Sequence, residues 1–183
     1  QHLMRDIDGA IHTYENALEY ITVQDNPLRV ARIYVHLAMM YMADRNFKAA
    51  ARYLARSKKF FSPQKTPHYF VIYQSIHGLF QCVQGNFEAA ILELTEAFTS
   101  FKSMQSFFGM YVVAQGLGRA YFLSNQLSQA EAIFRTLEAQ EKALGQPFSQ
   151  SNSSLFLSYM NIEQDSDLMV IKMQELINLK TPY

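Results

Sequence analysis

Small residues recur at a fixed interval within an otherwise apolar pattern. Ala10, Ala50, Ala90 and Ala130 follow one another at steps of 40 residues. Four positions after each alanine stands a large apolar residue, and seven positions after it stands a small or apolar one. Offsets of four and seven fall on one face of an α-helix, so the pattern predicts four helices that bury this face. The residues at these two offsets are Tyr14, Leu54, Leu94 and Phe134, and then Ala17, Ser57, Ala97 and Leu137.

A further helix is predicted before each of the last three of these four helices. Twelve positions ahead of the alanine stands another small residue among large apolar ones, as at Ala38, Gly78 and Gly118, and by extrapolation Ser158. Polar, turn-like segments separate the two helices of a pair, and longer breaks separate the pairs. Small residues let the two backbones approach closely, and the large residues then bury against the next pair. The turns lie at 43–46, 84–86, 124–126 and 164–167, and the breaks near 25–27, 62–67, 102–103 and 145–147.

The spacing of these residues resembles the tetratricopeptide repeat. One unit carries the signature as Leu117, Gly118, Tyr121, Ala130 and Phe134. An earlier unit repeats it closely, the third departs from it, and the unit at about 151–180 is degenerate. The earlier unit has Leu37, Ala38, Tyr41, Ala50 and Leu54, and the third has His77 and Gln81 where the signature has Leu and Tyr.

The resemblance implies one all-α domain over residues 1–183, a right-handed superhelical solenoid of about four and a half helix pairs. The 40-residue step exceeds the 34 residues of the standard repeat. It is similar to the longer variants found in bacterial regulators, namely the maltose-regulon activator with its LuxR-type relatives, and the peptide-pheromone receptors. The expected units are about 1–22 (a half repeat), 28–62, 67–101, 107–144 and 151–180, within a longer parent protein.

The same resemblance implies a binding groove lined by the first helix of each pair. Such a lining would be mostly apolar and adaptable, with a few polar groups that orient a peptide. We expect Arg119, one turn from Gln115 and near Phe122, to contribute most to binding. The alternative is that the rest of the parent chain covers the groove. The groove residues expected are Arg32, Val35, Met39, Met42, Ile72, Ser75, Leu79, Val112, Gln115, Arg119, Phe122, Asn152, Leu155 and Tyr159.

Composition and charge narrow the classes of partner. Cationic and anionic side chains number 16 each, so no net charge draws the whole chain to nucleic acid or an anionic membrane. We therefore expect no direct nucleic-acid binding and no membrane binding. The single cysteine, Cys82, cannot form an internal disulfide, which favours a reducing compartment and a cytoplasmic location.

Residues typical of catalytic and metal sites are not arranged as such sites need. The chain has no nucleophile elbow, no phosphate-binding glycine loop and no zinc-binding helix motif. Among the five histidines, His12 has acidic residues at helical spacing, Glu15 and less directly Glu19. We expect no enzyme activity, no metal and no cofactor. Cys82 lies in an apolar helix, where a buried and unreactive thiol is the usual outcome.

One strongly basic row runs along the predicted helix near residues 44–59. Its members are three or four positions apart, so they share a face. The row can dock an acidic partner or a phosphate backbone, or it can be a solvated outer face. We favour the solvated face, since the row contains no interleaved aromatic residue. The members are Arg45, Lys48, Arg52, Arg56 and Lys59.

Together these patterns predict a non-catalytic module that binds a protein or peptide. The similarity to bacterial regulators suggests the regulatory or sensor segment of a transcriptional or signalling regulator. The alternative is a structural scaffold or an oligomerisation segment. The first helix is expected to lack its own partner helix and to pack on a second copy or on the preceding helix of the parent protein. Its apolar face comprises Ile7, Ala10, Ile11, Tyr14 and Leu18.

Overall fold

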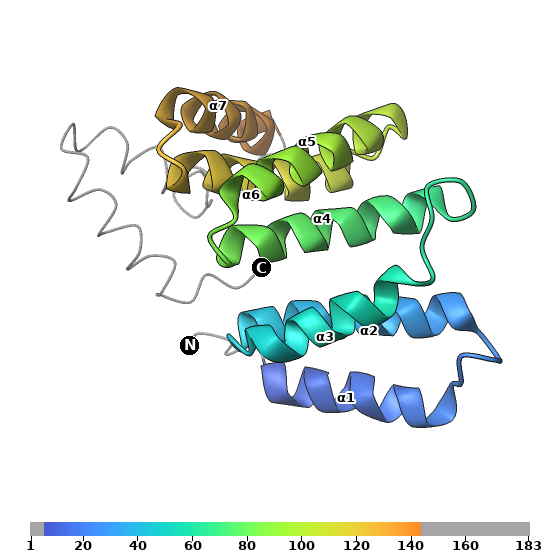
Figure 1. The fold of residues 1–183 in the computed structure, drawn as a ribbon. Helices are drawn as coiled ribbons and strands as arrows, with labels where there is room; N and C mark the ends of the chain where they lie inside the picture. The colour runs from blue at the N-terminus through green and yellow to red at the C-terminus, as the bar shows by residue number, and fades with distance from the viewer. Residues whose placement is uncertain (1–5, 144–183) are drawn as a thin grey trace. The chain divides into compact units, whose positions relative to one another are not determined.

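The computed structural model describes residues 6–143, which form seven α-helices and no strand (Figure 1). The expected all-α fold class is therefore confirmed for this part of the chain. The chain divides near Phe80 into two compact units, residues 6–80 and 81–143 of the described range, and each is described by itself. The helices are α1 (Ile7–Tyr20), α2 (Pro27–Ala43), α3 (Phe47–Lys58), α4 (Pro67–Val83), α5 (Phe87–Ser103), α6 (Phe107–Leu123) and α7 (Leu127–Ala143).

The helices begin at intervals of 20 residues, which explains the 40-residue step of the alanines as two helices per step. Five of the helices are 17 residues long, and four of these, α4 to α7, follow one another in the chain through connections of only three residues. The sequence pattern placed Lys102 and Ser103 in a break between units. That assignment is wrong, because α5 continues through both residues and the connection is 104–106. The first residues of α2 to α7 are Pro27, Phe47, Pro67, Phe87, Phe107 and Leu127.

The three-residue connections share one backbone geometry. After α2, Arg45 has a positive φ of 62° and donates its N–H to the carbonyl of Met42 at 3.1 Å. The next N–H, of Asn46, reaches back to the carbonyl of Tyr41 at 2.8 Å. This is a Schellman motif, which satisfies helix-end carbonyls and reverses the chain. Equivalent residues with positive φ are Gly85 (80°), Gln105 (55°) and Asn125 (61°).

The residue that closes the turn also begins the next helix in two cases. The side chain of Asn46 accepts a hydrogen bond from the N–H of Ala49 at 3.1 Å, and that of Ser106 accepts from Gly109 at 3.4 Å. Such N-caps satisfy amide groups that have no partner within the helix. One residue therefore ends one helix and starts the next, which keeps the connection short.

The connection from α3 to α4 is different. Helix α3 ends at Lys58, and residues 59–66 form a loop containing Pro63, which has no amide hydrogen to continue a helix. Ser62 and Thr66 close this loop through mutual contacts, including the N–H of Ser62 to Oγ1 of Thr66 at 2.9 Å. Helix α3 is five residues shorter than its neighbours, and this loop is five residues longer than the three-residue connections. Helix α4 therefore still begins 20 residues after α3.

In the first unit, α1 packs on α2 and α2 on α3. Ala38 of α2 and Ala50 of α3 are fully buried, as the spacing of small residues predicted. Leu54 and Ser57, at the two later offsets, are buried too.

The apolar face of α1 is less open than expected. Its Ile11 is buried and its other members are half-buried, since α2 covers them.

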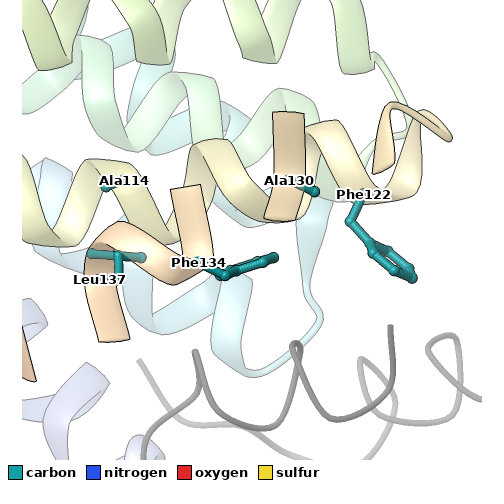
Figure 2. Packing of buried hydrophobic residues seen from close by; sticks show 5 residues of the cluster. All are labelled: Ala114, Phe122, Ala130, Phe134 and Leu137. Carbon is teal, nitrogen blue, oxygen red and sulfur yellow. The ribbon is translucent and has the colours of Figure 1, made fainter. Parts of the chain in front are cut away.

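In the second unit, α5 packs on α6 and α6 on α7. Five buried residues from the last two helices form a core cluster (Figure 2). Gly118 of α6 lies against the ring of Phe134 of α7, which is only 1% exposed. The predicted close approach of a small residue to the following helix is therefore present. The cluster comprises Ala114, Phe122, Ala130, Phe134 and Leu137.

Candidate functional site

The expected groove residues that the structure describes lie on three different helices, α2, α4 and α6. On α2, Arg32 is exposed, Val35 is buried, and Met39 and Met42 are half-buried. Seven further expected residues lie on α4 and α6. Ile72, Val112 and Gln115 are half-buried, and Ser75, Leu79, Arg119 and Phe122 are buried. Asn152, Leu155 and Tyr159 lie outside the described residues.

Burial decides which of these residues a partner can reach in this conformation. Arg119 is 9% exposed and Phe122 only 2%, so truncating either one would disturb packing as well as any binding. Arg32 is accessible, and its guanidinium carbon lies 5.5 Å from the centre of the Tyr69 ring. Arg32 is therefore the better probe of this set.

The basic row on α3 has aromatic partners that the sequence analysis missed. The guanidinium carbon of Arg52 lies 5.0 Å from the Tyr53 ring centre. That of Arg56 lies 5.6 Å from Tyr53 and 5.9 Å from Tyr34. The expectation of a row without aromatics is wrong. Tyr53 stands one position after Arg52 in the sequence, which was the available signal, while Tyr34 comes from α2.

Two tyrosines beneath this row share one carboxylate. The hydroxyls of Tyr41 and Tyr53 both donate to Oε1 of Glu15, at 2.8 Å and 3.1 Å. Their rings stack with centres 5.5 Å apart and planes 9° from parallel. We call Glu15, Tyr41 and Tyr53 the tyrosine–glutamate cluster. It joins one residue from each of α1, α2 and α3, so it fixes the three helices in register.

Burial and the hydrogen bonds to Glu15 raise the pKa of both hydroxyls. Burial, followed by the hydrogen bond to Glu15, raises the pKa of Tyr41 to about 12. The same two causes raise the pKa of Tyr53, while Arg52 opposes them. A protonated hydroxyl is a hydrogen-bond donor, which is what the carboxylate of Glu15 needs. The cluster is therefore stable as a donor–acceptor arrangement at neutral pH.

An open cavity of about 330 Å³ lies beside the cluster. Lys48 and Arg52 supply two positive charges to its wall, and the described residues that line it include no carboxylate. The other lining residues are Tyr41, Asn46 and Ala49, which contribute a ring, an amide and a methyl group. We call this the basic cavity. The basic cavity, with two cations and small apolar surfaces, suits an anionic group carried on a short side chain.

Two other titratable groups are shifted by burial. The His36 ring stacks on Tyr14 with centres 5.2 Å apart, and burial followed by the charge of Arg32 lowers the pKa of His36. In the second unit, burial raises the pKa of the Cys82 thiol to about 11, although Arg119 opposes the shift. Both groups are therefore uncharged at neutral pH. The expected burial of Cys82 is confirmed.

Within residues 6–143, no three His, Cys, Asp or Glu side chains come together as a group able to hold a metal ion. None of the helices described there combines the length and apolarity needed to cross a membrane. Compared with known proteins, the chain matches no family model and no curated sequence.

Proposed function

We propose that this chain is a non-catalytic helical-repeat module that binds a protein or peptide. In this proposal the helix pairs stack as a tetratricopeptide-type, right-handed solenoid, and the chain serves as a regulatory or sensor segment of a larger regulator. The regular 20-residue interval of the helices and their shared turn geometry support the repeat. Stacked repeats characteristically present long surfaces that contact partners at several points.

The observation that carries the proposal is a set of surface arginines held over aromatic rings. Arg32 lies over Tyr69, and Arg52 and Arg56 lie over Tyr53. Arginine and tyrosine are the residue types that contribute most to protein interfaces. An arginine already held against a ring loses less conformational freedom on binding than a free one. The exposed arginines of the first unit are thus already positioned for contact with a partner.

A peptide array tests this proposal. The labelled chain is incubated with several hundred unrelated 15-residue peptides, and each positive peptide is titrated in solution by fluorescence anisotropy. We expect a defined subset to bind saturably, because the arginines provide directional contacts. Arg32→Ala should weaken a share of these complexes by about tenfold, the usual scale for an interface arginine.

Arg29→Ala is the matched control. Arg29 is also exposed on α2, so both variants remove one positive charge from the same helix. Equal loss for Arg29→Ala and Arg32→Ala would assign the effect to charge alone. An array on which no peptide binds saturably would remove the basis for the proposed function.

A scaffold or oligomerisation role is the second candidate, and one feature of the second unit favours it. Phe107 and Phe108, at the start of α6, are 78% and 80% exposed, and the neighbouring Met104 is partly exposed. Adjacent exposed aromatic residues are typical of surfaces that meet another protein. Light scattering of the wild type and of Phe107→Ser/Phe108→Ser tests this role. Loss of an oligomer in the variant would support it, and a monomeric wild type would exclude self-association through these residues.

A further inference from the structure

Positive charge is concentrated on one short segment of the chain. Residues 44–59 hold six of the 16 cationic side chains and only one of the 16 carboxylates. The remainder of the chain therefore carries an excess of negative charge, although the whole is neutral. Five of the six cations, all except Lys58, form the basic row, and every one of the six is exposed. Lys48, Arg52 and Arg56 lie on α3, whereas Arg45 precedes the helix and Lys59 follows it. An anionic partner would be attracted to this helix and repelled elsewhere.

The cations at the centre of the row are held in place by the residues beneath them. Arg52 and Arg56 lie over the Tyr53 ring, which stacks on Tyr41, and both tyrosine hydroxyls bond to Glu15. The carboxylate of Glu15 is thus engaged by two donors below the row. Such support lowers the entropy cost of binding, because the guanidinium groups are already ordered.

The spacing of the row suits an extended peptide. Lys48, Arg52 and Arg56 are four residues apart on α3, which separates them by about 6 Å along the helix axis. Side chains on one face of an extended strand recur about every 6.6 Å. Acidic residues at alternate positions of a peptide can therefore meet successive cations. The basic cavity, between Lys48 and Arg52, receives one of these carboxylates beside the Tyr41 ring and the Ala49 methyl.

We propose that the basic row and basic cavity of α3 dock an extended acidic peptide with Asp or Glu at alternate positions. The proposal rests on the proposed function and names its partner class. Lys48 and Arg52 bind the carboxylate in the basic cavity, and Arg56 binds the next one. Glu15 acts as a positioning residue, because it holds Tyr53, the ring over which both arginines lie.

The charge distribution favours a peptide over a nucleic acid. The row from Lys48 to Arg56 covers about 12 Å of helix, which meets only a few phosphates. Affinity for a nucleic-acid backbone grows with the number of phosphates neutralised, so this contact is weak. Outside residues 44–59 the sequence has 10 cationic side chains against 15 carboxylates, so the rest of the chain adds no net attraction for a longer polyanion. A short acidic peptide needs only the charges of the row.

Fluorescence anisotropy with defined probes tests the docking surface. The probe is a labelled 10-residue peptide with Glu at alternate positions, and the control peptide has Gln in place of each Glu. Lys48→Ala and Arg52→Ala should each weaken binding of the Glu peptide by about tenfold or more. Lys65→Ala also removes one exposed positive charge from the first unit but lies outside the row, so its affinity should stay within about twofold of the wild type. Circular dichroism verifies that each variant is folded.

Each alternative occupant gives a distinct result. Equal binding of the Glu and Gln peptides, or no saturable binding of the Glu peptide, would overturn the inference. Tighter binding of a 10-nucleotide single strand at the same salt concentration would assign the row to nucleic acid and overturn it too. So would a dimer, seen by light scattering, that Lys48→Ala dissociates, because a second copy would then occupy the row. If the array yields peptides that are not acidic, the proposed function stands and this inference fails.

Discussion

Gly118 of α6 and Phe134 of α7 lie so close that a Cβ added to the glycine would stand 2.7 Å from Cε1 and 2.8 Å from Cζ of the ring. It would also stand 3.2 Å from Cγ2 of Ile133. The ring cannot move outward freely, because it is buried in the core cluster formed by α6 and α7. The small residue is thus a steric requirement of this helix pair.

Gly118→Ala is therefore expected to destabilise the protein. Alanine gains about 1 kcal/mol over glycine inside a helix, but overpacking of this kind costs about 1–3 kcal/mol. Adding Phe134→Leu should make room for the methyl group, so the double variant should be more stable than the sum of the single changes predicts. Urea unfolding followed by circular dichroism measures all three. A more stable Gly118→Ala variant would contradict the close packing of α6 on α7.

The turn residues with positive φ give a second prediction, with opposite signs at equivalent positions. Gln105 has φ of 55° without being glycine, so Gln105→Gly should relieve strain and stabilise by about 0.5–1 kcal/mol. Gly85→Ala should destabilise by a similar amount, since its φ of 80° is unfavourable for alanine although nothing occupies the space around it. Thermal unfolding of both variants measures the effects. Changes of the same sign in both would contradict a shared turn geometry.

His36 predicts a specific dependence of stability on pH. Burial lowers its pKa in the folded chain, so below about pH 6.5 the unfolded chain binds more protons than the folded one. Above about pH 6.5, His36 therefore does not reduce the free energy of unfolding. As the pH falls from there toward the lowered pKa of the folded chain, His36 makes this free energy progressively smaller. Urea unfolding at pH 7.5 and 5.5 should show lower stability at the acidic pH, and His36→Gln should reduce this difference.

For each variant, the stability at pH 5.5 is compared with the stability of the same variant at pH 7.5, because losing the ring stack on Tyr14 also affects stability at every pH. His68→Gln, on an exposed histidine of the same unit, serves as the matched control and should keep the wild-type difference. If His36→Gln keeps it as well, another group is responsible for the acid sensitivity.

The buried thiol predicts slow chemical modification. With a pKa of about 11, Cys82 has very little thiolate at pH 8, and burial limits access further. We expect labelling by a thiol reagent to be slower than in the urea-unfolded chain by a factor on the order of a hundred or more. Mass spectrometry of timed samples follows the reaction. Similar rates for the native and unfolded chains would show that the thiol is accessible.

The sequence predicted the parts of the fold that depend on local spacing. The buried positions of Ala50, Ala90 and Ala130 follow from helical periodicity, which is readable within a single helix. The tyrosine–glutamate cluster could not be predicted, because its members are separated by 26 and 38 residues and meet only through packing. Burial of Arg119 likewise depends on which neighbours cover α6, and no local pattern reports this.

The most direct test of the account is amide hydrogen exchange on the complex with an array-selected peptide, combined with mass spectrometry of the peptide itself. We expect slower exchange in the α2–α3 region, residues 27–58, and an unchanged peptide mass after prolonged incubation, because the proposed function is binding of a partner without a chemical reaction. A cleaved or modified peptide, or exchange that no bound peptide slows anywhere in these helices, would contradict it.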